Sequence, residues 1–316
     1  MSSAMPAHNF PPASRILVTS AAGFIGRHLC SRLSAWNLEV HGTSRRDRPR
    51  VAGEPIWWQA DMADLAAARR IFSTVKPDIV VHLAGSTGAS TDRDLVLPTY
   101  QSLATSTVNV LVQASELGCA RVILAGSLSE PVSGCEAPIP GSPYSAAKWI
   151  GSTYGRMFHA LYDTPVVNLR PFMAYGPGQT RGKLIPSVAL SVLNGEAPRL
   201  SSGRMRGDWI FIDDVTDAFV LAAATPGIEG QTFDLGTGGL TSIRALVEKL
   251  LEVMGSEIMP LFGAIPDRPY EQEIAADTAQ AAEKLGWRAT TSLEVGLRKT
   301  VAWYRANSGS VEAADL

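Results

Sequence analysis

The feature that most constrains the fold is the stretch from Arg15 to Gly26, which reads RILVTSAAGFIG. Ile16–Val18 is a short run of branched apolar residues, which is typical of a buried strand. A turn of small residues follows, and helical spacing returns at Arg27–Trp36. A strand, a tight turn and a helix together place backbone N–H groups where they can bind a phosphate. The turn follows the pattern G-x-x-G-x-x-G, with Ser20 in place of the first glycine. Such a turn is by itself weak evidence of a dinucleotide site.

Apolar segments alternate with helical segments through the first half of the chain. The expected strands are Arg15–Thr19, Glu39–Ser44, Ile56–Ala60, Ile79–Leu83, Arg121–Ala125 and Val166–Arg170. The expected helices between them are Phe24–Trp36, Leu65–Val75, Thr99–Leu117 and Ser145–Tyr162. This alternation predicts a parallel sheet with helices on both faces and right-handed crossovers.

The regular alternation breaks after Arg170. Further strands are expected at Trp209–Ile212 and Thr232–Leu235, and further helices at Leu184–Asn194, Ile243–Met254, Thr278–Leu285 and Leu293–Arg305. We predict an α/β fold, a Rossmann-type doubly wound parallel sheet with a smaller interleaved C-terminal α/β substrate-binding portion. The expected domains are a dinucleotide-binding domain at 15–175, to which 209–237 returns, a substrate-binding domain at 176–208 and 238–306, and flexible tails at 1–14 and 307–316.

Composition excludes several classes of protein. A net charge of −2 gives no reason to expect nucleic-acid binding, and the apolar runs are far shorter than a membrane span. The N-terminal residues lack the pattern of a secretory signal. Cys30, Cys119 and Cys135 are odd in number and scattered, which suits a reducing compartment and gives no metal-ligand spacing. We therefore expect a cytoplasmic protein without a metal.

Tyr144 and Lys148 are four positions apart in a helical segment, so they share one helix face. A free phenol has a pKa near 10, and a neighbouring ammonium is expected to lower that pKa toward the working range. This pair is therefore a candidate for general acid–base catalysis by Tyr144.

These features together resemble the short-chain dehydrogenase/reductase superfamily, in its extended branch that acts on nucleotide sugars. The resemblance runs from about Arg15 to Tyr304. It includes the turn, the polar residues at Thr43–Arg46 and the pair Tyr144 and Lys148. Further pieces in the expected order are Asp61-Met62, His82–Gly85, Leu169–Phe172, Tyr175–Gly178, Asp208–Val215 and Leu285–Trp287.

The resemblance implies a dinucleotide cofactor and a set of residues that contact it. The expected residues are Ser20, Gly23, Phe24, Ile25 and Gly26 at the pyrophosphate, Asp61 and Met62 at the adenine, Leu83, Ala84 and Gly85 beneath the riboses, Tyr144 and Lys148 at the nicotinamide ribose, and Pro171.

The second strand ends at Ser44 and is followed by Arg45 and Arg46, where an NAD site usually carries an acidic residue. Guanidinium groups bind phosphate, whereas a carboxylate would repel the 2′-phosphate of NADP. We therefore favour NADP over NAD, although NAD stays possible because such charged runs are often only solvated loops.

A third catalytic group, Ser or Thr after the fifth strand, is implied by the resemblance. Counting from the strand end selects Ser127, which we prefer, and counting back from Gly134 selects Ser129. Relatives that eliminate water carry an acid two residues after this hydroxyl, where this chain has Ser129 or Pro131. Dehydration and decarboxylation are therefore disfavoured against chemistry that needs only hydride and proton transfer.

The substrate-binding positions depart from the family pattern. The resemblance implies contacts from Ser127, Ser129, Met173, Arg206 and Arg268. Met173 stands where relatives have Asn, and it cannot supply an amide's hydrogen bonds. Either the two arginines hold a pyrophosphate with less help, or the substrate is not an ordinary nucleotide sugar.

The resemblance implies an NAD(P)-dependent 4-epimerase or 4-keto-sugar reductase acting on a nucleotide-activated sugar. Two alternatives stay open: a catalytically silent dinucleotide-binding regulatory protein, and a reductase of a non-nucleotide substrate. The helices at Thr99–Leu117 and Ser145–Tyr162 form a two-fold contact in many relatives, so a homodimer is also expected by resemblance.

Overall fold

The computed structural model describes residues 10, 14–36, 38–83, 85, 88, 90–130, 139–268 and 272–307. The chain forms two compact units and passes between them repeatedly. Unit 1 consists of Met1–Arg170, Thr216–Asp234 and Ala279–Trp287, and unit 2 of Pro171–Val215, Leu235–Thr278 and Arg288–Leu316.

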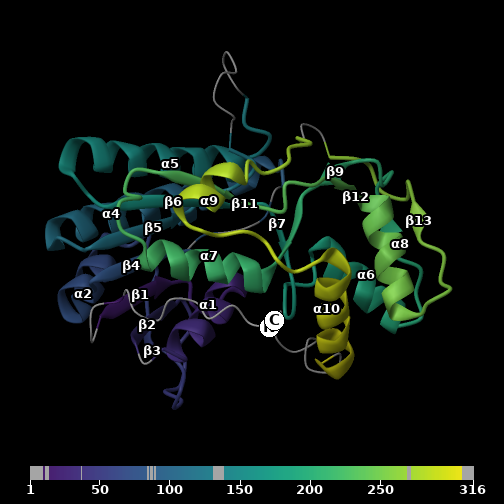
Figure 1. Ribbon diagram of the computed structural model, residues 1–316, viewed down its shortest axis with the longest axis horizontal. Coiled ribbons are helices and arrows are strands. Elements are labelled where there is room, and N and C mark those ends of the chain that lie inside the picture. Colours follow the sequence, from purple (N-terminus) through teal and green to yellow (C-terminus); the bar gives the residue numbers. More distant parts are fainter. Residues whose placement is uncertain are drawn as a thin grey trace. The chain divides into compact units, whose positions relative to one another are not determined.

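A seven-stranded parallel sheet is the centre of unit 1, in the order β11-β6-β5-β4-β1-β2-β3 (Figure 1). Its strands are β1 (Arg15–Thr19), β2 (Glu39–Ser44), β3 (Ile56–Gln59), β4 (Ile79–His82), β5 (Arg121–Ala125), β6 (Val166–Pro171) and β11 (Thr232–Leu235). The predicted strands of the first half are confirmed to within one residue at each end. Between β1 and β4 the strand order reverses, which is where doubly wound sheets bind their ligands.

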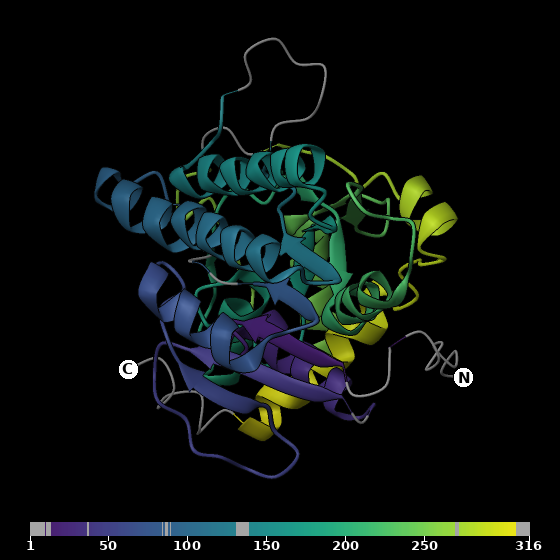
Figure 2. The ribbon, with the colours of Figure 1, turned by 90° about the vertical axis from the view of Figure 1, so that its left-hand side faces the viewer.

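Helices cover both faces of this sheet. They are α1 (Phe24–Ser34), α2 (Leu65–Val75), α3 (Val96–Thr99), α4 (Ser106–Leu117), α5 (Pro143–Tyr162), α7 (Ile212–Ala224) and α9 (Ala279–Lys284), with η1 at Arg93–Leu95 and η2 at Tyr100–Thr105. One core cluster joins Leu17 and Val80 of the sheet to α2, α4 and α5, and Figure 2 shows α4 and α5 side by side. Another link joins α1 to α7 through an ion pair between Arg32 and Asp217.

The helix expected at Thr99–Leu117 differs in its first part. Tyr100–Thr105 is a π-helical segment, and the regular α4 begins only at Ser106. Hydroxyl groups bond back to the chain here: Ser106 Oγ donates to the carbonyl of Ser102 at 2.7 Å, and Thr107 Oγ1 donates to that of Leu103 at 2.6 Å. Such back-bonding bends helices.

Unit 2 contains three two-stranded sheets and a group of packed helices. Its strands are β7 (Met173–Tyr175), β8 (Arg199–Leu200), β9 (Arg206–Gly207), β10 (Trp209–Phe211), β12 (Thr241–Ser242) and β13 (Leu261–Phe262), paired β10-β7, β12-β9 and β13-β8. Its helices α6 (Leu184–Leu193), α8 (Ile243–Met254) and α10 (Leu293–Asn307) pack against one another.

Asp208 fixes the loops of unit 2. It is fully buried, and its carboxylate accepts from the backbone N–H groups of Thr237 at 2.7 Å, Gly238 at 2.8 Å and Ala276 at 3.1 Å. Three charge-assisted bonds compensate its desolvation. None of the helices in the described part of the chain combines the length and apolar character that a membrane crossing requires.

Candidate active site

The turn between β1 and α1 has the geometry of a phosphate cradle. Ser20 has φ 52°, a left-handed conformation that is uncommon for a residue with a Cβ. Gly26 lies so close to the turn that a Cβ there would be 2.5 Å from the carbonyl oxygen of Ser20. Gly23 precedes α1 and, within the described residues, no side chain caps that helix. The first N–H groups of α1, at Phe24, Ile25 and Gly26, therefore fit the pyrophosphate of a dinucleotide.

The end of β2 lies beside this turn because β2 pairs with β1 in parallel register. Thr43 Oγ1 accepts from the backbone N–H of Ser20 at 3.1 Å, which joins the two segments. Ser44 Oγ accepts from the backbone N–H of Arg46 at 3.2 Å, and Arg45 and Arg46 are exposed. The structure therefore presents two guanidinium groups directly after β2.

The other expected cofactor residues lie at the same edge of the sheet or just beyond it. Asp61 Oδ1 accepts from the backbone N–H of Ala63 at 2.9 Å, so it also shapes its own turn. Met62 is buried, and the backbone N–H of Leu83 donates to Thr19 Oγ1 at 3.0 Å. Gly85 has φ 128°, and a Cβ there would collide with Leu103. Ala84 lies outside the described residues. Pro171 is the last residue of β6 and the first residue of a unit 2 segment.

Ser127, Ser129, Tyr144 and Lys148 come together beyond the end of β5. Ser142 caps α5 by accepting from the backbone N–H of Ser145, so Tyr144 and Lys148 lie on the first turns of that helix. Ser127 is buried and hydrogen-bonds with the Tyr144 phenol. Its Oγ lies 2.9 Å from Ser129 Oγ, so both serines that the sequence offers lie at this site. Ser127 hydrogen-bonds with the tyrosine, and Ser129 hydrogen-bonds with Ser127.

The expected lowering of the Tyr144 pKa is wrong for this structure. Burial raises the pKa of Tyr144 above its ordinary value, and the hydrogen bond with Ser127 opposes that effect. Lys148 Nζ donates to the carbonyl of Ala125 at 2.6 Å and lies 5.9 Å from the centre of the Tyr144 ring. Burial also lowers the pKa of Lys148 to about 8, against the opposing charge of Glu130.

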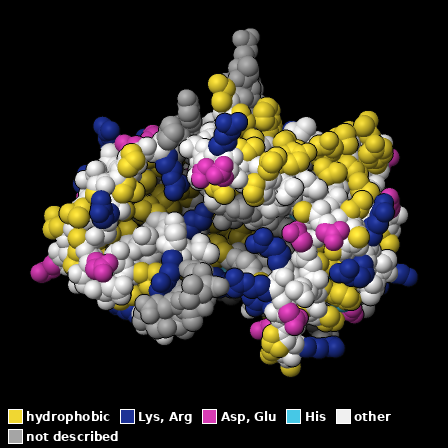
Figure 3. Space-filling model, turned by 180° about the vertical axis from the view of Figure 1, so that it is seen from behind, with side chains coloured by type: hydrophobic (Ala, Val, Ile, Leu, Met, Phe, Trp, Pro, Cys, Tyr) yellow, Lys and Arg dark blue, Asp and Glu magenta, His cyan; other side chains and the backbone are white. Residues whose placement is uncertain are grey.

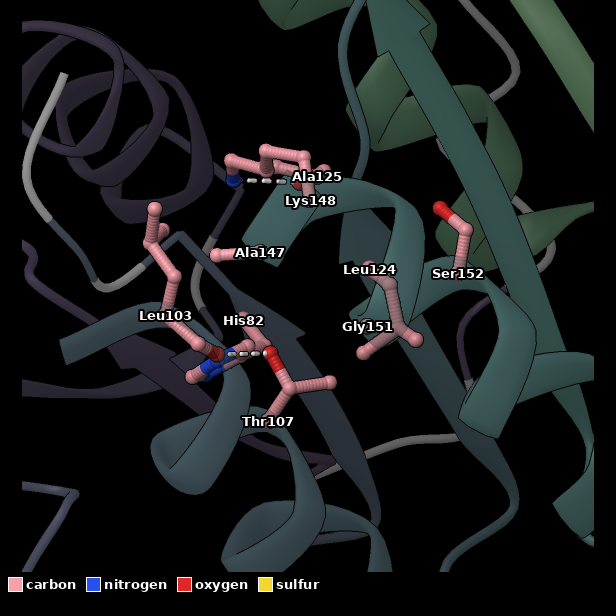
Figure 4. Close-up of a pocket in the computed structure, with 9 residues that line it drawn as sticks. All are labelled: His82, Leu103, Thr107, Leu124, Ala125, Ala147, Lys148, Gly151 and Ser152. Atoms are coloured by element: carbon pink, nitrogen blue, oxygen red, sulfur yellow. Dashed lines mark hydrogen bonds between the residues drawn. The ribbon is translucent and has the colours of Figure 1, made fainter. Parts of the chain in front are cut away.

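A small cavity lies beneath Lys148 and is lined by residues of β4, β5, η2, α4 and α5 (Figure 4). His82 lies at its base, where its Nδ1 is 2.9 Å from Thr19 Oγ1. Burial, with the charge of Lys148, lowers the pKa of His82 to about 3, so its ring is neutral at physiological pH. His82 therefore joins β4 to β1 as a neutral imidazole.

Glu130 is an ionisable residue of this site to which the sequence assigned no role. It is only 3% exposed, and its Oε1 accepts from the backbone N–H of Ser127 at 2.7 Å. Its position directly after Ser129 was the available signal, but a glutamate in a loop after a strand is usually solvated.

The expected substrate residues Met173, Arg206 and Arg268 all belong to unit 2. Met173 lies on β7, and its N–H donates to the carbonyl of Asp208 at 3.0 Å. Arg206 is exposed on β9 and its N–H donates to Glu273 at 3.0 Å. Arg268 is exposed and acts electrostatically on Lys183.

Lys183 is a second residue that the sequence reasoning missed. It immediately precedes α6, and burial and the charge of Arg268 lower its pKa. Lys183 therefore stands at the N-terminal end of a helix, where negative charge is favoured. The available signal was Lys183 directly before the apolar run Leu184–Ile185.

A family model described as "NAD dependent epimerase/dehydratase family" matches residues 16–236. Among curated proteins, UDP-glucose 4-epimerase of Mycolicibacterium smegmatis is 32% identical over 93% of this chain and 99% of that protein. The dTDP-glucose 4,6-dehydratase of Neisseria gonorrhoeae is 30% identical over 92% of this chain and 96% of that protein.

Solved structures agree with these matches. UDP-glucose 4-epimerase of Thermotoga maritima with UDP-glucose has a TM-score of 0.85 at 27% identity and covers 93% of this chain and 99% of its own. UDP-glucose 4-epimerase of Thermus thermophilus in complex with NAD has a TM-score of 0.81 at 25% identity and covers 94% of this chain and 99% of its own.

Proposed function

Because this chain belongs to the NAD-dependent epimerase/dehydratase family, we propose that it is a nucleotide-sugar 4-epimerase with Tyr144 as its acid–base catalyst. The nicotinamide cofactor supplies reversible hydride exchange at the sugar carbon. Tyr144 takes the proton of the hydroxyl on that carbon as a C=O bond forms, and returns it when the hydride is restored. Return of the hydride to the opposite face inverts the carbon, so atoms and electrons balance over the cycle.

Ser127 and Lys148 support this proton transfer. The Ser127 hydroxyl, hydrogen-bonded with Tyr144, is positioned to bind the reacting oxygen of the sugar. Lys148 Nζ, held by the carbonyl of Ala125 at 2.6 Å, is positioned for the nicotinamide ribose and for the Tyr144 phenolate. Ser129 is assigned a supporting contact to Ser127.

The observation that carries the choice of reaction is the direction of the Glu130 carboxylate. Dehydration needs an acid that reaches the sugar, but this carboxylate is buried and accepts from the backbone N–H of Ser127. Simple hydride and proton transfer therefore suits the site better than elimination, although dehydratases are among the relatives.

The pair Arg45 and Arg46 supports NADP as the preferred dinucleotide, and with it a second candidate function, reduction of a 4-keto sugar. NADPH is the usual reductant of the cell, so a site selective for it favours net reduction over recycling of the hydride. Removing a charged hydrogen bond costs about 1.5–3 kcal/mol. Each of Arg45→Ala and Arg46→Ala should therefore raise the Kd for NADPH about tenfold or more and leave the Kd for NADH unchanged. Arg69→Ala on α2 is the control and should change neither Kd.

Lys183 and Arg268 are proposed to hold the diphosphate of the substrate, at the start of α6. Lysine binds phosphate as a point charge, whereas arginine does so through a planar fork. Arg206 is kept as a further contact because it is exposed on β9 in the same unit. Met173 is assigned an apolar contact to the substrate, since it offers no hydrogen bond.

The test is incubation of the purified protein with UDP-galactose, followed by separation of UDP-galactose from UDP-glucose. Nucleotide released on denaturation is identified by mass. Conversion of UDP-galactose to UDP-glucose by protein that retains bound dinucleotide supports the epimerase. Consumption of added NADPH in the presence of a UDP-4-keto-hexose supports the reductase. Tyr144→Phe should lower kcat by about 10²–10⁴-fold, and Tyr162→Phe on the same helix should not. Turnover that survives in Tyr144→Phe would contradict the proposed role of Tyr144. Absence of turnover in the wild type would instead favour a catalytically silent regulatory protein.

We also propose a homodimer formed through α4 and α5. Apolar side chains are exposed on these elements and next to them, including Leu97 at 70%, Leu161 at 66% and Tyr162 at 56%. Figure 3 shows hydrophobic side chains gathered at the upper right, over the region of α4 and α5. Sedimentation velocity at micromolar concentration should give a dimer, and Leu161→Asp should give a monomer. A cytoplasmic location is part of the same proposal, and it rests on the odd, scattered cysteines.

A further inference from the structure

A buried carboxylate lies directly behind the catalytic serine. Glu130 is 3% exposed, although it lies in the irregular segment that follows β5. Carboxylates are almost never buried unless they are paired, because desolvation of the charge is costly. The surroundings of Glu130 must therefore compensate this cost.

Glu130 and Ser127 hold each other in a closed ring of hydrogen bonds. The backbone N–H of Ser127 donates to Glu130 Oε1 at 2.7 Å, and the backbone N–H of Glu130 donates to the carbonyl of Ser127 at 3.1 Å. Gly126 makes room for this ring, because a Cβ at Gly126 would lie 2.6 Å from Oε1. Without the carboxylate, the buried N–H of Ser127 would lose its acceptor.

The same carboxylate lies near the Lys148 ammonium, because Lys148 Nζ donates to the carbonyl of Ala125 while Glu130 Oε1 accepts from the N–H of Ser127, two residues further along the chain. Ser152 of α5 hydrogen-bonds with it, and the charges of Lys148 on α5 and Arg170 on β6 favour its ionised form. Burial outweighs these effects and raises the pKa of Glu130. In return, the charge of Glu130 raises the pKa values of Lys148 and of Tyr144.

We propose that Glu130 is a positioning residue that fixes Ser127 against Tyr144 and supplies the negative charge that stabilises the Lys148 ammonium. This inference rests on the proposed function for the roles of Tyr144 and Lys148. Glu130 acts from behind the serine, through its backbone and through charge, and it does not touch the sugar.

Glu130→Gln separates the charge of Glu130 from its shape, because the amide oxygen can still accept from Ser127. Protein labelled with 13C at the lysine Cε is titrated by NMR, and the Lys148 resonance is assigned by its absence from Lys148→Arg. We expect its midpoint, about pH 8 in the wild type, to move to lower pH in Glu130→Gln. Glu283→Gln, an exposed glutamate of α9, is the matched control and should titrate like the wild type.

Turnover of UDP-galactose is the second readout. A displaced catalytic group costs up to about a hundredfold in rate, so kcat should fall about ten- to hundredfold with KM and bound dinucleotide unchanged. Both limbs of the pH profile should move to lower pH, since Lys148 and Tyr144 lose the same negative neighbour. An unmoved Lys148 midpoint would overturn the inference, as would a kcat loss that only follows loss of folded protein by circular dichroism. If the wild type shows no turnover, the proposed function fails and the NMR titration still decides the role of Glu130.

Discussion

Replacing Gly26 by alanine should damage both the fold and cofactor binding. A Cβ at Gly26 would lie 2.5 Å from the carbonyl oxygen of Ser20, 2.7 Å from Ala21 Cα and 2.8 Å from Ala21 C. All three atoms are backbone, so no side-chain rotation relieves the contact and the turn itself must move. Overpacking of this kind costs about 1–3 kcal/mol. At about 2–4 °C per kcal/mol, the melting temperature should fall by about 2–12 °C.

The turn that must move leads directly into the first residues of α1, whose N–H groups, at Phe24, Ile25 and Gly26, are proposed to hold the pyrophosphate. Loss of one charged hydrogen bond is worth about 1.5–3 kcal/mol, so the Kd for the dinucleotide should rise about ten- to hundredfold. Isothermal titration with NADH and NADPH measures the affinity, and scanning calorimetry measures the melting temperature.

Two further glycines make the test quantitative. Gly182→Ala is the control, because a Cβ there meets nothing within 4 Å. Gly23→Ala should lie between the two, since its nearest contact would be 3.1 Å from the Ser20 carbonyl oxygen. If Gly26→Ala melts early but binds both dinucleotides normally, the turn only packs α1 on β1 and the cofactor site lies elsewhere. A melting temperature equal to that of the wild type would show that the turn accommodates the added Cβ without cost, against the expectation from these distances.

Three other substitutions test separate parts of the molecule. The pKa of Lys148 falls from 10.5 to about 8 on folding, so the free energy of unfolding should decrease as the pH drops from 10.5 to 8 and should stay constant below pH 8. Lys148→Met should remove this pH dependence. Melting temperatures measured across this pH range test it. Lys183→Ala should raise the Kd for UDP about tenfold in calorimetric titration, whereas Lys249→Ala should leave this Kd unchanged. Glu229→Gln leaves the Arg121 guanidinium, now 2.6 Å from that carboxylate, without its ion pair. Urea unfolding should show a loss of about 2–3 kcal/mol, less than for a fully buried pair because Glu229 is partly exposed.

The strands of unit 1 were predictable because each is a short run of branched apolar residues between turn signals. β1, β2 and β5 begin and end where the sequence indicates. The π-helical segment at Tyr100–Thr105 was not predictable, because an i→i+5 bond leaves no periodic signal in six residues.

The candidate site was predictable in its membership and less so in its electrostatics. Spacing alone brings Tyr144 and Lys148 to one helix face, but it does not show that Lys148 turns to the Ala125 carbonyl. Burial, which dominates the pKa of Tyr144, depends on tertiary packing. The buried position of Glu130 and the proximity of Lys183 to Arg268 also depend on contacts between residues far apart in the chain or in irregular loops.

The interleaving of the two units has a consequence for synthesis on the ribosome. β11 is an edge strand of the unit 1 sheet beside β6, and 64 residues, Phe172 through Leu235, are made after β6 ends and before β11 is complete. At about 5–20 residues per second this takes roughly 3–13 s. During that interval the nascent sheet presents the edge of β6, a template on which another nascent chain can add a strand. Slow codons or a chaperone acting between these two strands should therefore change the yield of folded protein more than the same intervention after residue 287, where the last segment of unit 1 ends.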